Sequence, residues 1–352
     1  MSPAATPRPG LRDVPPYASP QLAVTARLNT NECPLPLPEG FAEELAGEVA
    51  SLPLNRYPDG QMTRLREELA DSVGHRVEGT WAANGSNEIL TQLLQAYGGN
   101  GRRAAVFEPT YLLHSRIAWL TQTDIVSLRL NQGFSLSEES VSAAIDAATD
   151  VVFVCSPNNP TGNAQPVETV ASLAERIDAL VVVDEAYIEF GGSTCLPLVA
   201  DHPNVVVTRT MSKAFALAGA RIGYALASPE VVDDLQRVRL PYHLSAITQA
   251  AGVTALRYSK EAMAILDAIR DERNRILAAL RGMPDVTVYP SQANFVLFVP
   301  PKPAVEVWQG LVDRGVLIRD LSSVVPNALR VTAGTTDEVD LFLKSLEEVL
   351  AA

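Results

Sequence analysis

The sequence has few cysteines and histidines and no long uninterrupted run of apolar residues. Its three cysteines, Cys33, Cys155 and Cys195, are far apart, odd in number and without a Cys-x-x-Cys pair. That pattern argues against a disulfide framework or a zinc site and fits a reducing, cytoplasmic compartment. The four histidines show no ligand spacing either, so we expect no metal. No stretch approaches the roughly 18 continuous apolar residues that a bilayer span requires, so we expect no membrane partner.

Positive charge is also scarce. Lysine and arginine total 28 against 41 acidic residues, which gives a formal net charge of -13. This balance argues against broad contact with nucleic acid or with an anionic membrane. An anionic small molecule would have to be held by a few well-placed arginines. The first sixteen residues contain five prolines and no apolar segment, so we expect a loose arm rather than a signal peptide.

What the sequence does contain is a series of short apolar runs separated by helical patterns, between about residues 80 and 228. The runs are Ala104–Phe107, Val151–Cys155, Val181–Val183 and Val205–Thr208. This alternation predicts an α/β fold with a mostly parallel sheet covered by helices. Ligands of such sheets bind beyond the carboxyl ends of the strands, so the residues that follow each run are the candidates for chemistry.

The pattern changes after about residue 240, and a chain of 352 residues is long enough for two lobes. A helical stretch over about 245–281 precedes strand-like runs at 293–299, 316–319 and 329–332, with a helix near 304–314 between them. A last helix opens with the capping-box pair Thr335 and Glu338. We therefore expect a large domain over 51–240 and a smaller α+β domain over 241–352. Residues 1–50 are expected to form an arm and to complete the small domain.

Polar residues follow three of the predicted strands. Asn159 lies in an Asn-Pro-Thr-Gly motif, Asp184 directly follows a run of valines, and Lys213 comes shortly after the last run. The apolar neighbours of Lys213 predict a buried amine with a lowered pKa, which is nucleophilic near neutral pH. A lone lysine would more often lie at the surface. Asp184 would need a cation if it is buried, although an ordinary helix N-cap explains it equally well.

A candidate phosphate site opens the helix near Ile89. The segment Gly85-Ser86-Asn87-Glu88 precedes this helix, and the free N–H groups of a helix N-terminus favour an anion. We expect Ser86 to cap the helix and to contact the anion at the same time. Tyr111 follows the Ala104–Phe107 run, where a lone tyrosine would more often belong to the core.

These motifs, in this order and at this spacing, resemble the fold-type I aminotransferases that use pyridoxal 5′-phosphate. The resemblance implies that Lys213 carries the cofactor and later moves a proton, while Asp184 pairs with the protonated pyridine nitrogen. It also implies that Asn159 and Tyr187 contact the phenolic oxygen of the cofactor and that Tyr111 stacks on its ring. The implied phosphate contacts are Ser86, Asn87, Thr210, Ser212 and Arg221.

Within that family, nearly the whole chain is most similar to the histidinol-phosphate aminotransferases. The similar stretches are residues 28–32, 55–59, 83–88, 184–190 and 329–332. In this subgroup the tyrosine that matches Tyr57 reaches across a homodimer to the partner's cofactor phosphate. The resemblance also implies that Arg319, Arg330 and Tyr17 hold anionic groups of the substrate. Alternatives are an ion pair of Arg319 with Asp320 and a disordered arm around Tyr17.

The resemblance implies amino transfer in two half-reactions between histidinol phosphate and 2-oxoglutarate, as part of histidine biosynthesis. Three positions that border the substrate pocket of the subgroup depart from its pattern: Cys33, Ala333 and the segment 112–115. The alternatives for the substrate are therefore an aromatic amino acid or, in a decarboxylase, threonine phosphate. Outside catalysis, the alternatives are a regulatory protein that binds the cofactor and an α/β domain with an unknown ligand.

Overall fold

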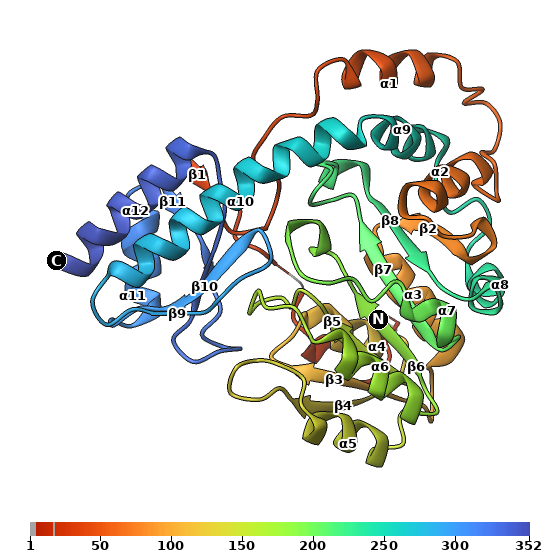
Figure 1. The fold of residues 1–352 in the computed structure, drawn as a ribbon, viewed down its shortest axis with the longest axis horizontal. Helices are drawn as coiled ribbons and strands as arrows, with labels where there is room; N and C mark the ends of the chain where they lie inside the picture. Colours follow the sequence, from red (N-terminus) through yellow and green to blue (C-terminus); the bar gives the residue numbers. More distant parts are fainter. Residues whose placement is uncertain (1–4, 17) are drawn as a thin grey trace.

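The computed structural model describes residues 5–16 and 18–352, so the predicted arm residue Tyr17 lies outside the described residues. A seven-stranded sheet with the order β2-β8-β7-β6-β5-β3-β4 forms the centre of the large lobe (Figure 1). Its strands are β2 (Thr80–Asn84), β3 (Arg103–Glu108), β4 (Asp124–Arg129), β5 (Val151–Cys155), β6 (Leu180–Asp184), β7 (Val205–Thr210) and β8 (Ile222–Leu226). Neighbouring strands run parallel except at β8, which is antiparallel to β2 and β7. The predicted α/β fold with a mostly parallel sheet is confirmed.

The strands that could be predicted from the sequence are mainly those that are buried on both faces and rich in valine. Every residue of β5, β6 and β7 is buried, and most of them are valines. β-branched side chains fit a pleated strand whose two faces are both covered. The strands β2 and β8 are equally buried except at Asn84, but they carry alanine or glycine at several positions. The edge strand β4 is partly exposed. These three strands therefore lack the valine-rich signal.

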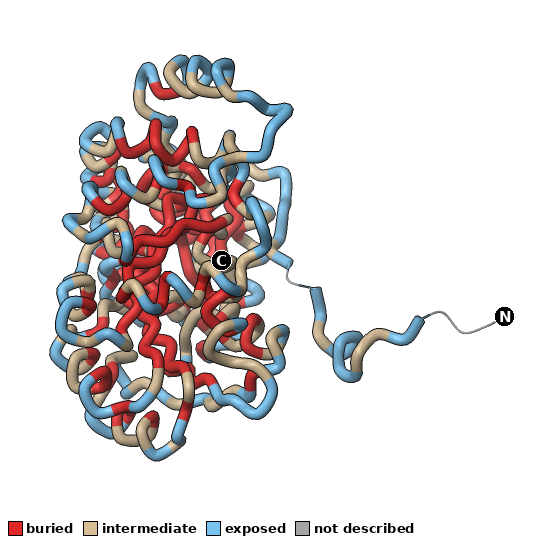
Figure 2. Tube along the Cα trace, turned by 90° about the vertical axis from the view of Figure 1, so that its right-hand side faces the viewer, coloured by how far each residue is buried: buried red, intermediate tan, exposed pale blue. Residues whose placement is uncertain are grey.

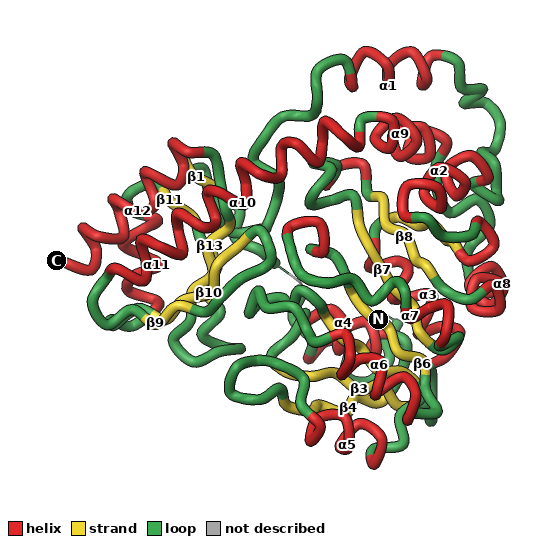
Figure 3. The backbone as a smooth tube through the Cα atoms, viewed as in Figure 1, coloured by secondary structure: helices red, strands yellow, loops and turns green. Residues whose placement is uncertain are grey.

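Helices cover both faces of the large sheet. In Figure 1, α3 (Ser86–Tyr97) and α4 (Leu112–Leu120) lie behind it, and α6 (Val167–Arg176) and α7 (Leu198–Asp201) lie in front. The other helices of this lobe are α2 (Thr63–Val73), α5 (Glu138–Asp146) and α8 (Pro229–Val238). Figure 3 shows loops filling much of the space between the large sheet and the smaller lobe. The site therefore lies among loops held by rigid elements.

The smaller lobe combines helices with a four-stranded antiparallel sheet of order β12-β13-β10-β9. Its strands are β9 (Thr287–Val288), β10 (Phe295–Val299), β12 (Arg319–Asp320) and β13 (Leu329–Thr332), and its helices include α11 (Ala304–Val312) and α12 (Thr336–Ala351). The predicted capping box of Thr335 and Glu338 opens α12 and is confirmed.

Two predictions for this region are wrong in detail. The helical stretch over 245–281 is two helices, α9 (Ala246–Arg257) and α10 (Ser259–Gly282), because Tyr258 leaves helical geometry with ψ at 17°. The predicted strand over 316–319 is also two strands. β11 (Val316–Leu317) pairs with the early strand β1 (Ala26–Arg27), whereas β12 joins the four-stranded sheet. Apolar periodicity marks a segment as helix or strand but does not show where its partner changes.

The N-terminal part of the chain is shared between several neighbours. Strand β1 pairs with β11, while α1 (Phe41–Ala50) lies against α9 through ion pairs of Glu44 and Glu48 with Arg257. The division of the chain near residues 50 and 240 stays a prediction.

Buried residues concentrate in the middle of the molecule, as Figure 2 shows, and the described arm residues 5–16 are mostly exposed. One continuous apolar core includes side chains from the large sheet and from β10, β13 and α12 of the smaller lobe. This shared core holds the two lobes against each other around the loops between them. Within the described residues, no helix has the length and apolar character needed to cross a membrane.

Candidate active site

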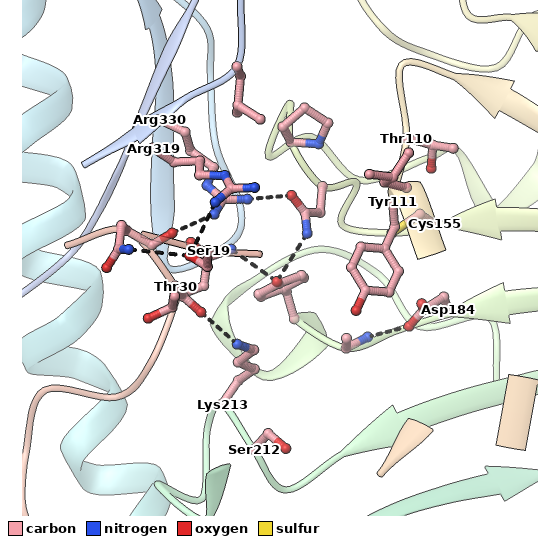
Figure 4. A pocket seen from close by; sticks show the side chains of 18 of the residues that line it. Ser19, Thr30, Thr110, Tyr111, Cys155, Asp184, Ser212, Lys213, Arg319 and Arg330 are labelled. Atoms are coloured by element: carbon pink, nitrogen blue, oxygen red, sulfur yellow. Dashed lines mark hydrogen bonds between the residues drawn. The ribbon is translucent and has the colours of Figure 1, made fainter. Parts of the chain in front are cut away.

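A cavity of about 470 Å³ lies between the two lobes, where the loops after β5, β6 and β7 face β12 and β13. Nearly all the predicted site residues line it: Ser86, Asn87, Tyr111, Asn159, Asp184, Tyr187, Thr210, Ser212, Lys213, Arg221, Arg319 and Arg330. Figure 4 shows Lys213 and Ser212 on one side of this cavity and the two small-lobe arginines on another. The fold thus brings together residues that are up to about 240 positions apart in the chain.

Lys213 presents a buried amine to the cavity. Its Nζ donates to the carbonyl oxygen of Thr30 at 3.0 Å and lies 5.9 Å from the centre of the Tyr187 ring. Burial, the positive charge of Arg330 and that of Arg221 together lower the pKa of Lys213 to about 8, while Glu32 acts in the opposite direction. Loss of hydration disfavours the ammonium form, so a neutral amine becomes accessible near physiological pH.

Asp184 ends β6 with its carboxylate buried against the histidine of α4. Its Oδ2 lies 3.0 Å from His114 Nε2, and its Oδ1 accepts from the backbone N–H of Ala186 at 3.2 Å. A carboxylate only accepts, so the hydrogen in this contact belongs to His114 Nε2. The His114 ring stacks on Phe153 with 4.8 Å between ring centres. The Asp184 carboxylate at the end of β6 is therefore held in place by His114 of α4, the helix that follows β3.

Tyr187 is linked to the small lobe through amide groups. Asn159 donates from Nδ2 to the Tyr187 phenol oxygen at 3.4 Å, and its Oδ1 accepts from Arg330 Nη1 at 2.6 Å. Arg330 also donates from Nη2 to the carbonyl oxygen of Asn29 and packs over the ring of Phe295. Burial raises the pKa of Tyr187 to about 12, so the phenol keeps its proton.

Hydroxyl and guanidinium donors converge at the carboxyl end of β7. Thr210 Oγ1 donates to Ser212 Oγ at 2.9 Å, and Arg221 Nη1 donates to the same oxygen at 3.1 Å. Arg221 adopts a left-handed conformation, with φ at 57°, directly before β8. These groups supply several donors and one fixed positive charge, which suits a phosphate.

The N-terminus of α3 adds backbone donors beside Arg221. The helix begins at Ser86 and its N-cap is Gly85, with no side-chain cap, so the prediction that Ser86 caps the helix is wrong. Gly85 has φ at 79°, and a Cβ there would come within 2.5 Å of Arg221 Nη2. Glycine therefore lets the guanidinium approach the helix end. Asn87, in the first turn of the same helix, accepts a hydrogen bond at Oδ1 from the Tyr111 hydroxyl at 3.3 Å.

Arg319 reaches the cavity from β12 beside the N-terminal arm. Its guanidinium donates to Ser19 Oγ at 3.1 Å and to the carbonyl oxygen of Ala18. Asp320 instead accepts from the backbone and side chain of Ser322. The alternative of an Arg319–Asp320 ion pair is therefore not what the described residues form.

Tyr57 is not among the residues that line the cavity. Its side chain is 80% exposed and stacks on Tyr242, with ring centres 4.5 Å apart and planes 10° apart. Exposed apolar residues from neighbouring segments of the chain, Leu54 and Leu240, are 60% and 74% exposed. Within a single chain, Tyr57 therefore lies on the surface and does not reach the cavity where the cofactor phosphate is predicted.

Several residues at or next to the cavity were not predicted as site residues. Ser19, Thr30 and Asn31 come from the segment before α1, and His114 of α4 lies behind the cavity, in contact with Asp184. Asn31 donates from Nδ2 to the Tyr187 phenol oxygen at 3.0 Å. The spacing of His114 three residues after Tyr111 is a usable signal, because both lie where a strand end meets a helix start. Thr30 and Asn31 lie in the similar stretch 28–32, which gave them no role, and Ser19 has no signal at all.

The donor set fits pyridoxal 5′-phosphate. A buried neutral amine suits an aldehyde, a carboxylate suits a protonated ring nitrogen, and the cluster of Ser212, Thr210 and Arg221 suits a phosphate. Among the described residues there is no group of three or more His, Cys, Asp and Glu side chains arranged to hold a metal ion. The residues at the cavity thus match an organic phosphate cofactor.

Comparison with known proteins gives a consistent picture. A family model described as aminotransferase class I and II matches residues 25–346. The chain is 48% identical over 349 residues to the histidinol-phosphate aminotransferase of Thermobifida fusca, covering 96% of this chain and 94% of that protein. It is 49% identical to the Streptomyces avermitilis protein of the same name, covering 97% of this chain and 96% of that protein. The crystal structure of the Sinorhizobium meliloti histidinol-phosphate aminotransferase in complex with pyridoxal-5′-phosphate matches with a TM-score of 0.89 at 24% identity, covering 100% and 99% of the two chains.

Proposed function

This chain belongs to the class I and II aminotransferase family, and from that premise we propose that it transfers an amino group between histidinol phosphate and 2-oxoglutarate. Its cofactor is pyridoxal 5′-phosphate. The reaction forms imidazole-acetol phosphate and glutamate, and in histidine biosynthesis it runs in the reverse direction. The observation that carries the proposal is the pair of guanidinium groups, Arg319 and Arg330, at the cavity into which Lys213 projects.

Lys213 is the proposed catalytic base. When bound, the cofactor supplies an aldehyde for the amine and a ring that withdraws electrons from the reacting carbon. Lys213 Nζ would hold the aldehyde group of the cofactor and, once free, would move a proton from the Cα of the substrate. Its lowered pKa keeps a neutral amine available for this step. Asp184 holds a proton on the ring nitrogen and is itself held by His114.

The remaining predicted contacts orient the cofactor. We assign the phosphate to Arg221, Thr210 and Ser212, supported by their converging hydrogen bonds. The N-terminus of α3, with Ser86 and Asn87, faces the same cavity. Asn159 and Tyr187 are assigned to the phenolic oxygen.

The ring of the cofactor is assigned to Tyr111, which would stack against it. Leu112 and Ala186 also line the cavity, and apolar surfaces of this kind exclude water from the reacting atoms.

The substrate end of the cavity is assigned to Arg319 and Arg330. A histidinol-phosphate molecule carries one dianionic phosphate, whereas glutamate carries a second carboxylate in its place. Planar guanidinium groups bind either anion with paired hydrogen bonds. Arg330 also contacts Asn159, so the anion end of the cavity is joined directly to the proposed cofactor end.

We further propose a homodimer in which Tyr57 of one subunit contacts the cofactor phosphate of the other. Its exposure and the neighbouring apolar residues support an interface there. Tyr17 is proposed to contact the substrate phosphate. The protein is proposed to work in the cytoplasm, a compartment consistent with three free cysteines, two of them buried.

The proposal is tested by half-reactions of the purified protein loaded with pyridoxal phosphate. Adding histidinol phosphate is expected to make the visible absorption band of the cofactor disappear rapidly. Histidinol is the matched control, because it lacks only the phosphate, and it should react roughly a hundredfold more slowly if the arginines bind that group. Rapid conversion by phenylalanine but not by histidinol phosphate would show an aromatic amino acid enzyme. Release of carbon dioxide from threonine phosphate would show a decarboxylase.

A further inference from the structure

The phenol of Tyr187 is held between two amide side chains. Asn31 Nδ2 lies 3.0 Å from the phenol oxygen and Asn159 Nδ2 lies 3.4 Å from it. The Phe295 ring packs edge-on against the tyrosine, with 5.2 Å between ring centres. Tyr187 is 5% exposed and lines the cavity. The direction in which its hydroxyl hydrogen points therefore depends on which atoms of the two amides face it.

The orientation of the Asn31 amide is fixed by Thr332. The backbone N–H of Asn31 donates to Thr332 Oγ1 at 3.1 Å. The hydrogen of that hydroxyl goes to Asn31 Oδ1 at 3.0 Å. With Oδ1 accepting from a hydroxyl, Nδ2 is the atom that faces Tyr187.

The orientation of the Asn159 amide is fixed in the same way by a group that cannot accept. Arg330 Nη1 lies 2.6 Å from Asn159 Oδ1, and a guanidinium only donates. The amide nitrogen of Asn159 is therefore also the atom that faces the phenol. Both neighbours of Tyr187 donate to it.

Asn31 is unusually well fixed for a residue in a loop. It adopts a left-handed conformation with φ at 55°, which asparagine tolerates better than most residues. It is 2% exposed, and its carbonyl oxygen accepts from Asn294 Nδ2 at 3.2 Å. Its hydrogen bonds therefore tie the loop before α1 to the smaller lobe and to Tyr187 at once.

We propose that Asn31 is a positioning residue that makes Tyr187 an obligatory hydrogen-bond donor toward the cavity. An oxygen that accepts from two amides has only its own hydrogen to offer. That hydrogen would be available to the cofactor's phenolic oxygen, where a donor stabilises negative charge. The inference rests on the proposed function, because it takes the contact between Tyr187 and the cofactor from it. Thr332 acts indirectly, because its hydrogen bond to Oδ1 orients the side-chain amide of Asn31.

The test is a pH titration of the visible absorption of the protein loaded with pyridoxal phosphate, without substrate. In Asn31→Asp the new carboxylate accepts the phenol hydrogen, so the cofactor loses its donor. Its phenolic oxygen then holds a shared proton more tightly, and the pH midpoint rises by about one unit, the equivalent of one hydrogen bond. Thr332→Val, which adds no charge and frees the amide to turn, shifts the midpoint in the same direction. Thr332→Ser keeps the hydroxyl and is the matched control, with an unchanged midpoint.

The outcomes separate this inference from the proposed function. If the unsubstituted protein binds no pyridoxal phosphate and shows no visible band, the proposed function fails. If it shows the band, and folded Asn31→Asp and Thr332→Val keep its midpoint, the role of Asn31 is wrong while the proposed function stands. A shift in Thr332→Ser equal to that in Thr332→Val would also overturn the role, because the hydroxyl would then have no part in it.

Discussion

Lys213 changes its chemistry because of where the fold buries it. In water a lysine amine is almost entirely protonated at neutral pH. Here the amine is buried, which removes its hydration, and two arginines add positive charge that outweighs Glu32. Each of these disfavours the ammonium form. A single buried side chain thus gains the nucleophilic and basic character that amino transfer needs.

The lowered pKa of Lys213 predicts how the cofactor-free protein reacts with pyridoxal phosphate. Only the neutral amine attacks the aldehyde, so the rate should rise about tenfold per pH unit below the pKa and level off above it. With a pKa of about 8, the midpoint should lie near that pH. Stopped-flow absorbance after mixing measures the rate, with N-acetyl-lysine amide as the control amine. A midpoint near 10.5, the ordinary lysine value, would contradict the burial argument.

At the scale of elements, the site depends on close approach between a helix end and a strand. A Cβ at Gly223 in β8 would come within 2.1 Å of the backbone nitrogen of Ser86 at the start of α3. Gly85 leaves room for Arg221 in the same place. Two glycines therefore let a helix N-terminus, a guanidinium and the Ser212 hydroxyl converge, which no single element could achieve.

Gly85→Ala is predicted to weaken cofactor binding strongly. The added methyl group would displace Arg221 and would also strain a backbone with φ at 79°. If one charge-assisted hydrogen bond to the phosphate is lost, the dissociation constant of pyridoxal phosphate should rise by roughly tenfold to a hundredfold, as measured by fluorescence titration.

Gly74→Ala is a control for a methyl group added at a glycine of positive φ where it meets no neighbour. Gly74 has φ at 67° at the end of α2, but a Cβ there meets nothing within 4 Å. It should cost about 1 kcal/mol of stability through the left-handed backbone and leave cofactor affinity unchanged. Equal losses of affinity in both variants would mean that backbone strain, rather than displacement of Arg221, explains the effect.

At the scale of the whole molecule, one exposed surface carries large apolar side chains. Tyr57 and Tyr242 stack on each other in an exposed position near Leu54 and Leu240. Apolar groups gathered on a surface mark interaction sites more often than chance. A second copy of this chain, bound by two-fold symmetry, would bury this surface and carry Tyr57 toward the partner's cavity.

The proposed dimer predicts complementation between two inactive variants. Lys213→Ala removes the amine from its own site, and Tyr57→Ala removes the contact that its subunit gives to the partner. After subunit exchange in an equal mixture, half of the dimers are mixed and each contains one intact site. Activity should then recover to roughly a quarter of the wild-type value, measured with histidinol phosphate and 2-oxoglutarate.

Two results would contradict this arrangement. Activity of the mixture that stays at the mean of the two separate variants would mean that each site is complete within one chain. Full activity of Tyr57→Ala by itself would mean that the tyrosine has no part in the site. Size-exclusion chromatography of each variant checks that the dimers persist.

The sequence by itself determined the class of fold, the main buried strands and the residues of the motifs. Runs of valine are a local signal, because a strand covered on both faces must be apolar at every position. Asp184, Asn159 and Lys213 could be identified because each follows such a run or lies in a recognisable motif. Arg221 and Tyr187 were predicted only through the family resemblance. The family resemblance added roles that periodicity does not contain.

Only the tertiary structure decided which distant residues meet. Asn31 contacts Tyr187 and Thr332, 156 and 301 positions away, and His114 contacts Asp184 across 70 positions. The extra strands β2, β4 and β8 and the break at Tyr258 also became visible only there. The physical reason is that apolar periodicity encodes which face of an element is buried, whereas a polar contact depends on how whole elements are placed around each other.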